Sequence, residues 1–392
     1  MRKASKGREG RSTLTANGRV SVTRTRRHPP GRGGETPVDH LLDAAEATVS
    51  RGVRQLCCLL NADAASFERA AENLLKAGGV RIGAELLRQV VEREGKQVLR
   101  CREDGRLRPA WGAGDCRGTR GVTRQYLGCD GFTSRLITHA EKRRRRRAVR
   151  QKRRRLRAGR LKPLPRAKRG ADQAFKEFKL VTFYDEPGEH RLVSVTRRDH
   201  HAAGRLMRRD AGRCGFFEAG QKLAVIDGGP WIINQVRRQS LPVTAVCLDF
   251  YHLAENAHRA RRWCFGEEDR AGHAWAADVL HAAKHRGYED LLERLVKWRG
   301  TLRSPHKRRA ADLLVNYVTD RREMIRYPTF LNEGWQIGSG PTESQCKQVP
   351  RRVKGRGKRW DADNAEAIMA LEAMRQSDLS DAYWTHCAAS PD

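Results

Sequence analysis

Short apolar runs that stop on an acidic residue are the clearest pattern in the middle of the chain. The run Leu223–Ile226 stops on Asp227, directly before a Gly-Gly-Pro turn, and the run Val243–Leu248 stops on Asp249. Apolar runs of this length, bounded by turn residues, are typical of buried strands. Each acid alone is as well explained as a turn residue or a helix cap. Two neighbouring strands that both end on a carboxylate instead indicate a shared functional edge, because functional side chains collect where strands end.

Three further strands are expected before this pair. Val122–Leu127 leads to Asp130 in a Gly-Cys-Asp-Gly segment, where a simple Asp-Gly turn is the alternative interpretation. Phe178–Tyr184 and Arg191–Thr196 are separated by a short loop with Pro and Gly, which predicts a hairpin. The sequence therefore predicts an α/β (α+β) fold with a mixed sheet.

Helical periodicity flanks and interrupts these strands and divides the chain into five expected segments. Residues 1–36 form a disordered basic arm, and residues 37–120 form a small all-helical N-terminal domain, which either binds DNA or serves as a scaffold or dimer contact. Residues 121–252 hold the first part of the α/β domain and carry a basic insertion at 142–170. Residues 253–330 form an inserted helical subdomain, and residues 331–392 complete the α/β domain.

The charge of the chain points to a polyanionic partner. Its 392 residues include 79 Lys and Arg against 46 Asp and Glu, a net charge of +33. Thirteen of the nineteen residues in 142–160 are Lys or Arg, a density that repels itself unless phosphates are present. No apolar stretch approaches the ~18 residues of a membrane span, and we expect neither a membrane nor a signal peptide. The ten cysteines form no CxxC pair, so we expect reduced thiols in the cytoplasm.

A helix with an acid and bases on one face is predicted near residue 340. Pro341 suits a helix start after a Gly-Ser-Gly loop, and Glu343 falls in the first turn. Lys347 and Arg351 follow at one and two turns, and could accompany a metal and its phosphates. An ordinary capping acid on a solvated basic helix is the alternative, and Pro350 should kink or end the helix.

These motifs together resemble the RNase H-like DDE transposases of prokaryotic insertion sequences, of the ISKra type. The resemblance covers about two-thirds of the chain and rests on DGGPWI at 227–232, LDFYH at 248–252, IGSGPTESQCKQV at 337–349 and GRGKRW at 355–360. It implies an RNase H-like sheet whose first and fourth strands carry metal ligands.

The resemblance also implies a site and a reaction. Asp130, Asp227 and Glu343 would be catalytic and would hold two Mg²⁺ (or Mn²⁺) ions about 4 Å apart for phosphodiester hydrolysis and transesterification at transposon ends. Asp249 competes with Asp227 for the place of the second ligand; Asp227 is preferred because the first and fourth strands of this fold carry the ligands. Asp249 and His252 are then expected as outer-shell residues. The residues expected to bind DNA are Lys347, Arg351, Arg352, Lys354, Arg143, Arg144, Arg145, Arg153 and Arg154.

The expected partner is double-stranded DNA, both transposon ends and target, bound by a homo-oligomer in the cytoplasm and associated with the nucleoid. Two other functions remain open. An inactive or domesticated RNase H-like DNA-binding protein would show no Mg²⁺-dependent nicking, and a structure-specific nuclease would cut without joining strands.

Overall fold

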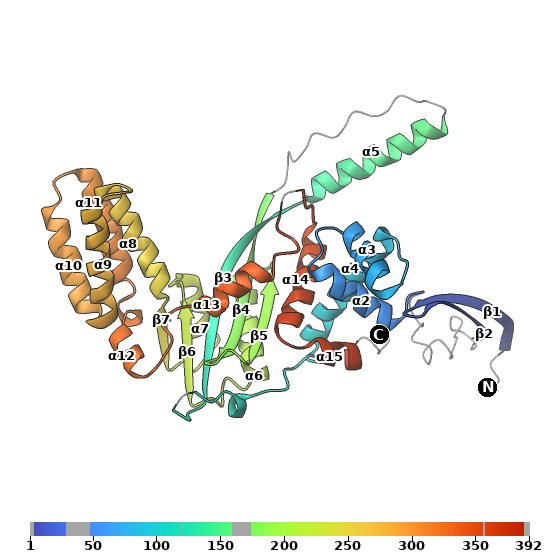
Figure 1. Ribbon diagram of the computed structural model, residues 1–392, viewed down its shortest axis with the longest axis horizontal. Helices are drawn as coiled ribbons and strands as arrows, with labels where there is room; N and C mark the ends of the chain where they lie inside the picture. Colours follow the sequence, from blue (N-terminus) through green and yellow to red (C-terminus); the bar gives the residue numbers. More distant parts are fainter. Residues whose placement is uncertain (1–3, 29–47, 119, 159–173, 356, 388–392) are drawn as a thin grey trace. The chain divides into compact units, whose positions relative to one another are not determined.

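The structure is a computed structural model that describes residues 4–28, 48–118, 120–158, 174–355 and 357–387 (Figure 1). Parts of four expected segments lie outside the described residues: residues 1–3 and 29–36 of the basic arm, 37–47 and 119 of the N-terminal helical domain, 159–170 of the basic insertion, and 356 and 388–392 of the last segment.

Contacts within the chain define two compact units, each assembled from segments far apart in the sequence. Unit 1 comprises residues 1–108, 133–177 and 348–392, and unit 2 comprises residues 109–132 and 178–347. The boundaries expected at residues 120, 252 and 330 are therefore not boundaries between compact units. The helices expected to form an N-terminal domain share their unit with the C-terminal segment.

Five strands form one mixed sheet, which confirms the α/β class (Figure 1). Their order is β5 (Arg191–Thr196), β4 (Ala174–Asp185), β3 (Arg124–Leu136), β6 (Gln221–Ile226) and β7 (Ala245–Leu248). β4 and β5 are antiparallel, as expected of a hairpin, whereas β3 with β6 and β6 with β7 are parallel. Each parallel connection contains a helix, because parallel strands need a long crossover.

The strand that leads to Asp130 is longer than the sequence suggested. β3 begins at Arg124 and continues through Asp130 to Leu136, so the Asp-Gly turn considered there is wrong. Aromatic pairs hold this strand beside β4, with ring centroids 5.2 Å apart for Tyr126 and Tyr184 and 5.7 Å apart for Phe132 and Phe178. Buried stacked rings contribute beyond their area, which keeps the Gly-rich part of β3 extended.

The remaining elements of unit 2 are helical. They are η1 (Ala113–Asp115), α6 (His200–Arg213), α7 (Pro230–Arg238), α8 (Phe250–Phe265), α9 (Arg270–His285), α10 (Tyr288–Thr301), α11 (Pro305–Thr319), η2 (Arg322–Met324), α12 (Tyr327–Asn332) and α13 (Gly340–Gln348). Helices α8 to α12 occupy the segment where the sequence predicted a helical insertion. Trp275 and Trp298, with ring centroids 4.1 Å apart, pack between α9 and α10.

Unit 1 begins with a hairpin where a disordered arm was expected. β1 (Ala4–Thr15) and β2 (Gly18–His28) pair in an antiparallel register, so this part of the expectation is wrong. The alternating Thr, Val and Leu near the turn give this basic segment strand character, and Leu14 is buried. The helices of the unit are α2 (Arg51–Ala62), α3 (Phe67–Gly78), α4 (Ala84–Glu103), α5 (His139–Arg157), α14 (Ala362–Gln376), α15 (Ser380–Ala382) and η3 (Tyr383–Cys387).

Helices α4 and α14 form the centre of unit 1. A Cβ atom at Gly95 would lie 2.3 Å from the carbonyl oxygen of Ala367, so only glycine allows this close approach. The buried Glu94 accepts hydrogen bonds from Arg54 at 2.8 Å and from the Tyr383 hydroxyl at 2.6 Å. One paired acid thereby joins α2, α4 and η3, since a buried charge is stable only with partners.

Candidate active site

Three aspartates lie in one row across the parallel strands of unit 2. The β3–β6 register ends on Leu127 opposite Ala224, and Asp130 and Asp227 each follow three residues further along their chain segments. The β6–β7 register ends on Leu248 opposite Ile226, so Asp249 follows beside Asp227. The Asp249 N–H donates to the Ile226 carbonyl at 2.8 Å, which continues the ladder to that row. Parallel strands therefore bring these acids to one edge of the sheet.

Asp227 is close enough to Asp130 to influence the charge of the Asp130 carboxyl. Burial raises the pKa of the Asp130 carboxyl above its ordinary value, and the nearby negative charge of Asp227 raises it further. Backbone N–H groups bind both acids: Gly131 donates to Asp130 Oδ1 at 2.6 Å and Gly229 donates to Asp227 Oδ1 at 2.7 Å. Two half-buried, neighbouring carboxylates with few protein donors are a suitable oxygen ligand set for a cation.

Asp249 differs from these two acids because it is fully buried and well supplied with donors. Its Oδ1 accepts from the Tyr251 N–H at 2.6 Å and caps α8. Its Oδ2 accepts from both the N–H of Ser339, at 2.8 Å, and the Ser339 hydroxyl. Phe250 extends this link, because its N–H donates to the Ile337 carbonyl at 2.9 Å. Asp249 therefore joins the start of α8 to the loop that leads into α13.

Helix α13 brings Glu343 to the same edge of the sheet. Its first turn packs on β3, where the Thr342 Oγ1 would lie only 1.8 Å from a Cβ atom at Gly128. Glu343 is partly exposed and lies 3.7 Å from Lys347, one turn further along. Cys346, three residues after Glu343, hydrogen bonds to Asp130. Residues three apart share a helix face, so one face of α13 reaches both Asp130 and the surroundings of Glu343.

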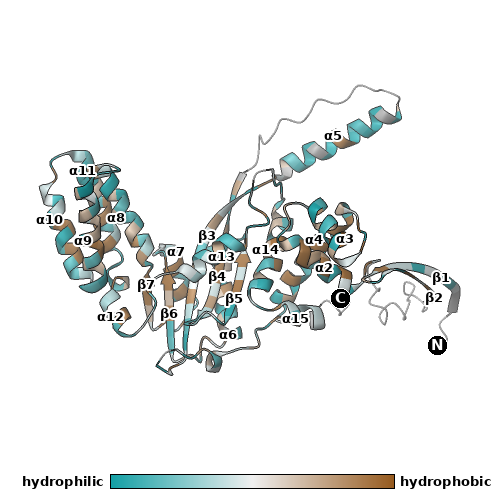
Figure 2. Ribbon diagram, viewed as in Figure 1, coloured by the Kyte–Doolittle hydropathy of each residue, from teal (hydrophilic) through white to brown (hydrophobic). Residues whose placement is uncertain are grey.

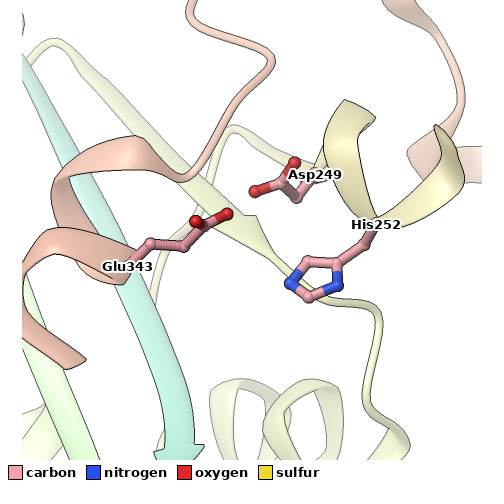
Figure 3. A group of neighbouring side chains, drawn as sticks. All are labelled: Asp249, His252 and Glu343. Carbon is pink, nitrogen blue, oxygen red and sulfur yellow. The ribbon is translucent and has the colours of Figure 1, made fainter. Parts of the chain in front are cut away.

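Figure 3 shows the Glu343 carboxylate turned toward Asp249, with the His252 ring close by. One ligand atom from each of these three residues lies within 4.8 Å of the other two. Asp249 follows β7, His252 lies in the first turn of α8, and Glu343 lies in the first turn of α13. Because Asp249 links the two helix starts, it also sets the separation of the other two side chains.

The expected triad is thus distributed over two adjacent groups. Asp130 lies beside Asp227 and Cys346, whereas Glu343 lies with Asp249 and His252. Among the described residues, only the second group brings possible metal-ligand atoms from three side chains within 4.8 Å of one another. The sequence suggested Asp249 and His252 as outer-shell residues, but it gave no sign of the roles of Ser339 and Cys346, apart from their closeness to Glu343 in the chain.

Arg351 and Arg352, two of the basic residues that follow Glu343, do not lie where a continuous helix would place them. Helix α13 ends at Gln348, before Pro350, so Arg351 is not on its face and instead lies 3.2 Å from Asp63. Arg352 is buried in unit 1, where it lies against both the Phe67 and Trp360 rings, with its guanidinium carbon 4.8 Å and 5.4 Å from their centroids.

The position of Arg352 makes it structural. Its Nε donates to the Asn61 carbonyl at 3.1 Å, and its Nη2 donates to the Asn61 Oδ1 at 3.1 Å. A buried arginine that packs on two rings and pairs with Asn61 is not free to reach DNA phosphates, so its place in the structure disagrees with the DNA-binding role expected of Arg352. Lys347 and Lys354 are exposed.

The other residues expected to bind DNA lie on α5. The side chains of Arg143, Arg144, Arg153 and Arg154 are exposed, and Arg145 belongs to the same helix. The basic insertion is therefore helical up to Arg157.

Comparison with known proteins adds no family assignment, because neither a protein-family model nor a curated protein matches the sequence. No helix in the described part of the chain has the length and apolar character that crossing a membrane requires.

Proposed function

We propose that the protein is a Mg²⁺-dependent DNA transposase that cuts transposon ends and joins them to target DNA. The observation that carries this proposal is the row of carboxylates at one edge of the sheet, with the Glu343 helix packed against it. Four acids and a histidine gathered in a chain of net charge +33 suit a site that binds a cation and acts on a polyanion.

The sheet topology supports an RNase H-like reading of the fold. β3 and β6, the first and fourth strands of the sheet in chain order, are neighbours and run parallel. The expected ligands Asp130 and Asp227 occupy corresponding positions on or just after these strands. Helix α13 follows the helical insertion and returns Glu343 to this edge, which is the arrangement that the resemblance implies.

The residues present suit divalent ions held by oxygen. Asp130, Asp227 and Glu343 would be the ligands, and Asp249 would orient the starts of α8 and α13. Two Mg²⁺ ions bound there would activate a water or a 3′-hydroxyl for in-line attack and stabilise the leaving oxygen. His252 offers a ring nitrogen beside Glu343 that can take up the released proton. Lys347 offsets the charge of the phosphates next to the site.

The test uses the full chain with duplex DNA that carries the genomic flanks of its reading frame, together with a target plasmid and Mg²⁺. A transposase yields joined products, and Asp130→Asn, Asp227→Asn and Glu343→Gln each abolish both cutting and joining while DNA binding remains. Cutting without joining would indicate a nuclease. Binding without any Mg²⁺-dependent cutting would indicate an inactive DNA-binding protein, and either result would overturn the proposal.

A further inference from the structure

Helix α5 is unusual because it carries positive charge on all its faces. Twelve of its nineteen residues are Lys or Arg, against a single acid, Glu141. Like charges three and four positions apart destabilise a helix, and positive charge near the N-terminus opposes the helix dipole. A helix of this composition is stabilised by compensating negative charge, and in the described part of unit 1 Glu141 and Asp361 lie at its N-terminal end.

That end is held firmly by the fold. The Ile137 N–H donates to the Trp360 carbonyl at 2.7 Å, directly before the helix. Glu141 is buried, and the Lys142 ammonium lies 2.7 Å from the Asp361 carboxylate. Beyond this anchor, every side chain described from 146 to 154 is exposed. Figure 1 shows α5 extending away from the other helices of unit 1, and Figure 2 shows it predominantly in hydrophilic colours.

We propose that α5 lies in the major groove of duplex DNA and contacts the phosphates of both flanking strands. An α-helix with its side chains is about 10–12 Å wide, which matches the ~12 Å major groove. At ~1.5 Å per residue the helix is about 28 Å long and carries twelve positive charges. The density of these charges along the helix axis approaches that of the phosphates along duplex DNA, one negative charge per ~1.7 Å. Charge on every face suits a helix with phosphates on both sides.

The composition of α5 argues against the other polyanions. It contains no Phe, Tyr or Trp on which the bases of a single strand could stack. Its four apolar residues, three of them Ala or Val, do not form the bulky apolar face of a membrane-surface helix. The major groove of A-form RNA is too deep and narrow to admit a helix. Duplex DNA is the remaining partner that this surface fits.

The test compares two variants of the full chain that lose equal charge from different faces of α5. One replaces Arg143, Arg150 and Arg157 with Gln, and the other replaces Arg144, Lys152 and Arg155 with Gln. At 100° per residue these two sets lie on roughly opposite sides of the helix. Gln keeps helix propensity, so the variants change charge and not fold. Replacing the exposed Lys297, Arg303 and Lys307 of unit 2 with Gln is the matched control.

The measurement is the dependence of duplex DNA affinity on salt, with single-stranded DNA and duplex RNA of equal length as comparisons. Each α5 variant should flatten the slope of log K against log salt by about 2.7, since each lost phosphate contact removes about 0.9, and the control should leave it unchanged. A flatter slope in only one of the two α5 variants would mean that one face of α5 contacts DNA, which would overturn the proposal. An unchanged slope for duplex DNA in both variants, or an equal change for single-stranded DNA or duplex RNA, would overturn it as well.

These results do not depend on the carboxylates. If the native chain shows no Mg²⁺-dependent cleavage but the α5 variants change the salt dependence as expected, the proposed function is contradicted and the proposal for α5 stands.

Discussion

Replacing Asp249 with Asn should destabilise the protein far more than the same change at Asp227. Asp249 is fully buried, and both of its carboxylate oxygens accept hydrogen bonds, from the Tyr251 N–H and from the Ser339 N–H and hydroxyl. Asn has a single acceptor oxygen. Whichever way the amide turns, its NH₂ group faces a backbone N–H, and one buried donor loses its partner.

The cost can be worked from these contacts. A hydrogen bond to a charged group contributes ~1.5–3 kcal/mol, and a buried unsatisfied donor costs ~1–3 kcal/mol. Because the two effects overlap, we expect Asp249→Asn to lower the free energy of unfolding by about 2–4 kcal/mol. Asp227 is half-exposed, and the hydrogen bond that its carboxylate accepts from the Gly229 N–H is kept by the Asn oxygen. Its replacement should cost less than about 1 kcal/mol.

Equilibrium urea unfolding, followed by tryptophan fluorescence without divalent ions, measures this difference. The midpoint of Asp249→Asn should fall clearly below that of the native chain, while Asp227→Asn stays close to it. Equal midpoints for all three proteins, or a larger loss at Asp227, would refute the idea that Asp249 joins α8 to α13.

Three further predictions concern the surroundings of the site. Asp130→Asn should stabilise the metal-free protein at pH 7. Because the pKa of Asp130 is raised in the folded state, the stability of the native chain falls as pH rises from the ordinary Asp pKa through the folded-state pKa. The variant should therefore unfold at a higher temperature than the native chain at pH 7, and this gain should vanish at pH values below the ordinary Asp pKa. Gly128→Ala should reduce stability by about 1–3 kcal/mol because the added Cβ meets Thr342. Gly300→Ala is the control and should not reduce stability, because there is open space around its Cβ. Chemical denaturation of both variants measures the difference. Arg352→Ala should lower the unfolding midpoint and leave the salt dependence of DNA binding unchanged, so a flattened salt slope with normal stability would return Arg352 to the DNA interface.

The features that the sequence predicted are those encoded locally. An apolar run followed by an acid and a turn identifies β6 and β7, and the β4–β5 hairpin follows from two short runs and a Pro-Gly loop. Pro350 correctly indicated that the Glu343 helix stops early. In each case the determining residues lie within one or two turns of each other in the chain.

The features that could not be predicted depend on partners far away in the sequence. A Gly-Cys-Asp-Gly segment suggests a turn, yet β3 passes through it because Thr342 fills the space above Gly128. Asp249 and Ser339 meet although 90 residues separate them. Arg352 in a basic run suggests DNA contact, but Phe67 and Trp360 pack against it. Such roles follow from packing, which no local pattern contains.

The account's central claim is that the acids at this edge of the sheet hold divalent metal ions. Titration of the full chain with Mn²⁺, followed by the loss of the free-ion electron paramagnetic resonance signal, tests it without a DNA substrate. We predict saturable binding that approaches two ions per chain, competed by Mg²⁺, and loss of at least one ion in Asp227→Asn and in Glu343→Gln. Unsaturable binding, or the same stoichiometry and affinity in both variants, would contradict the claim.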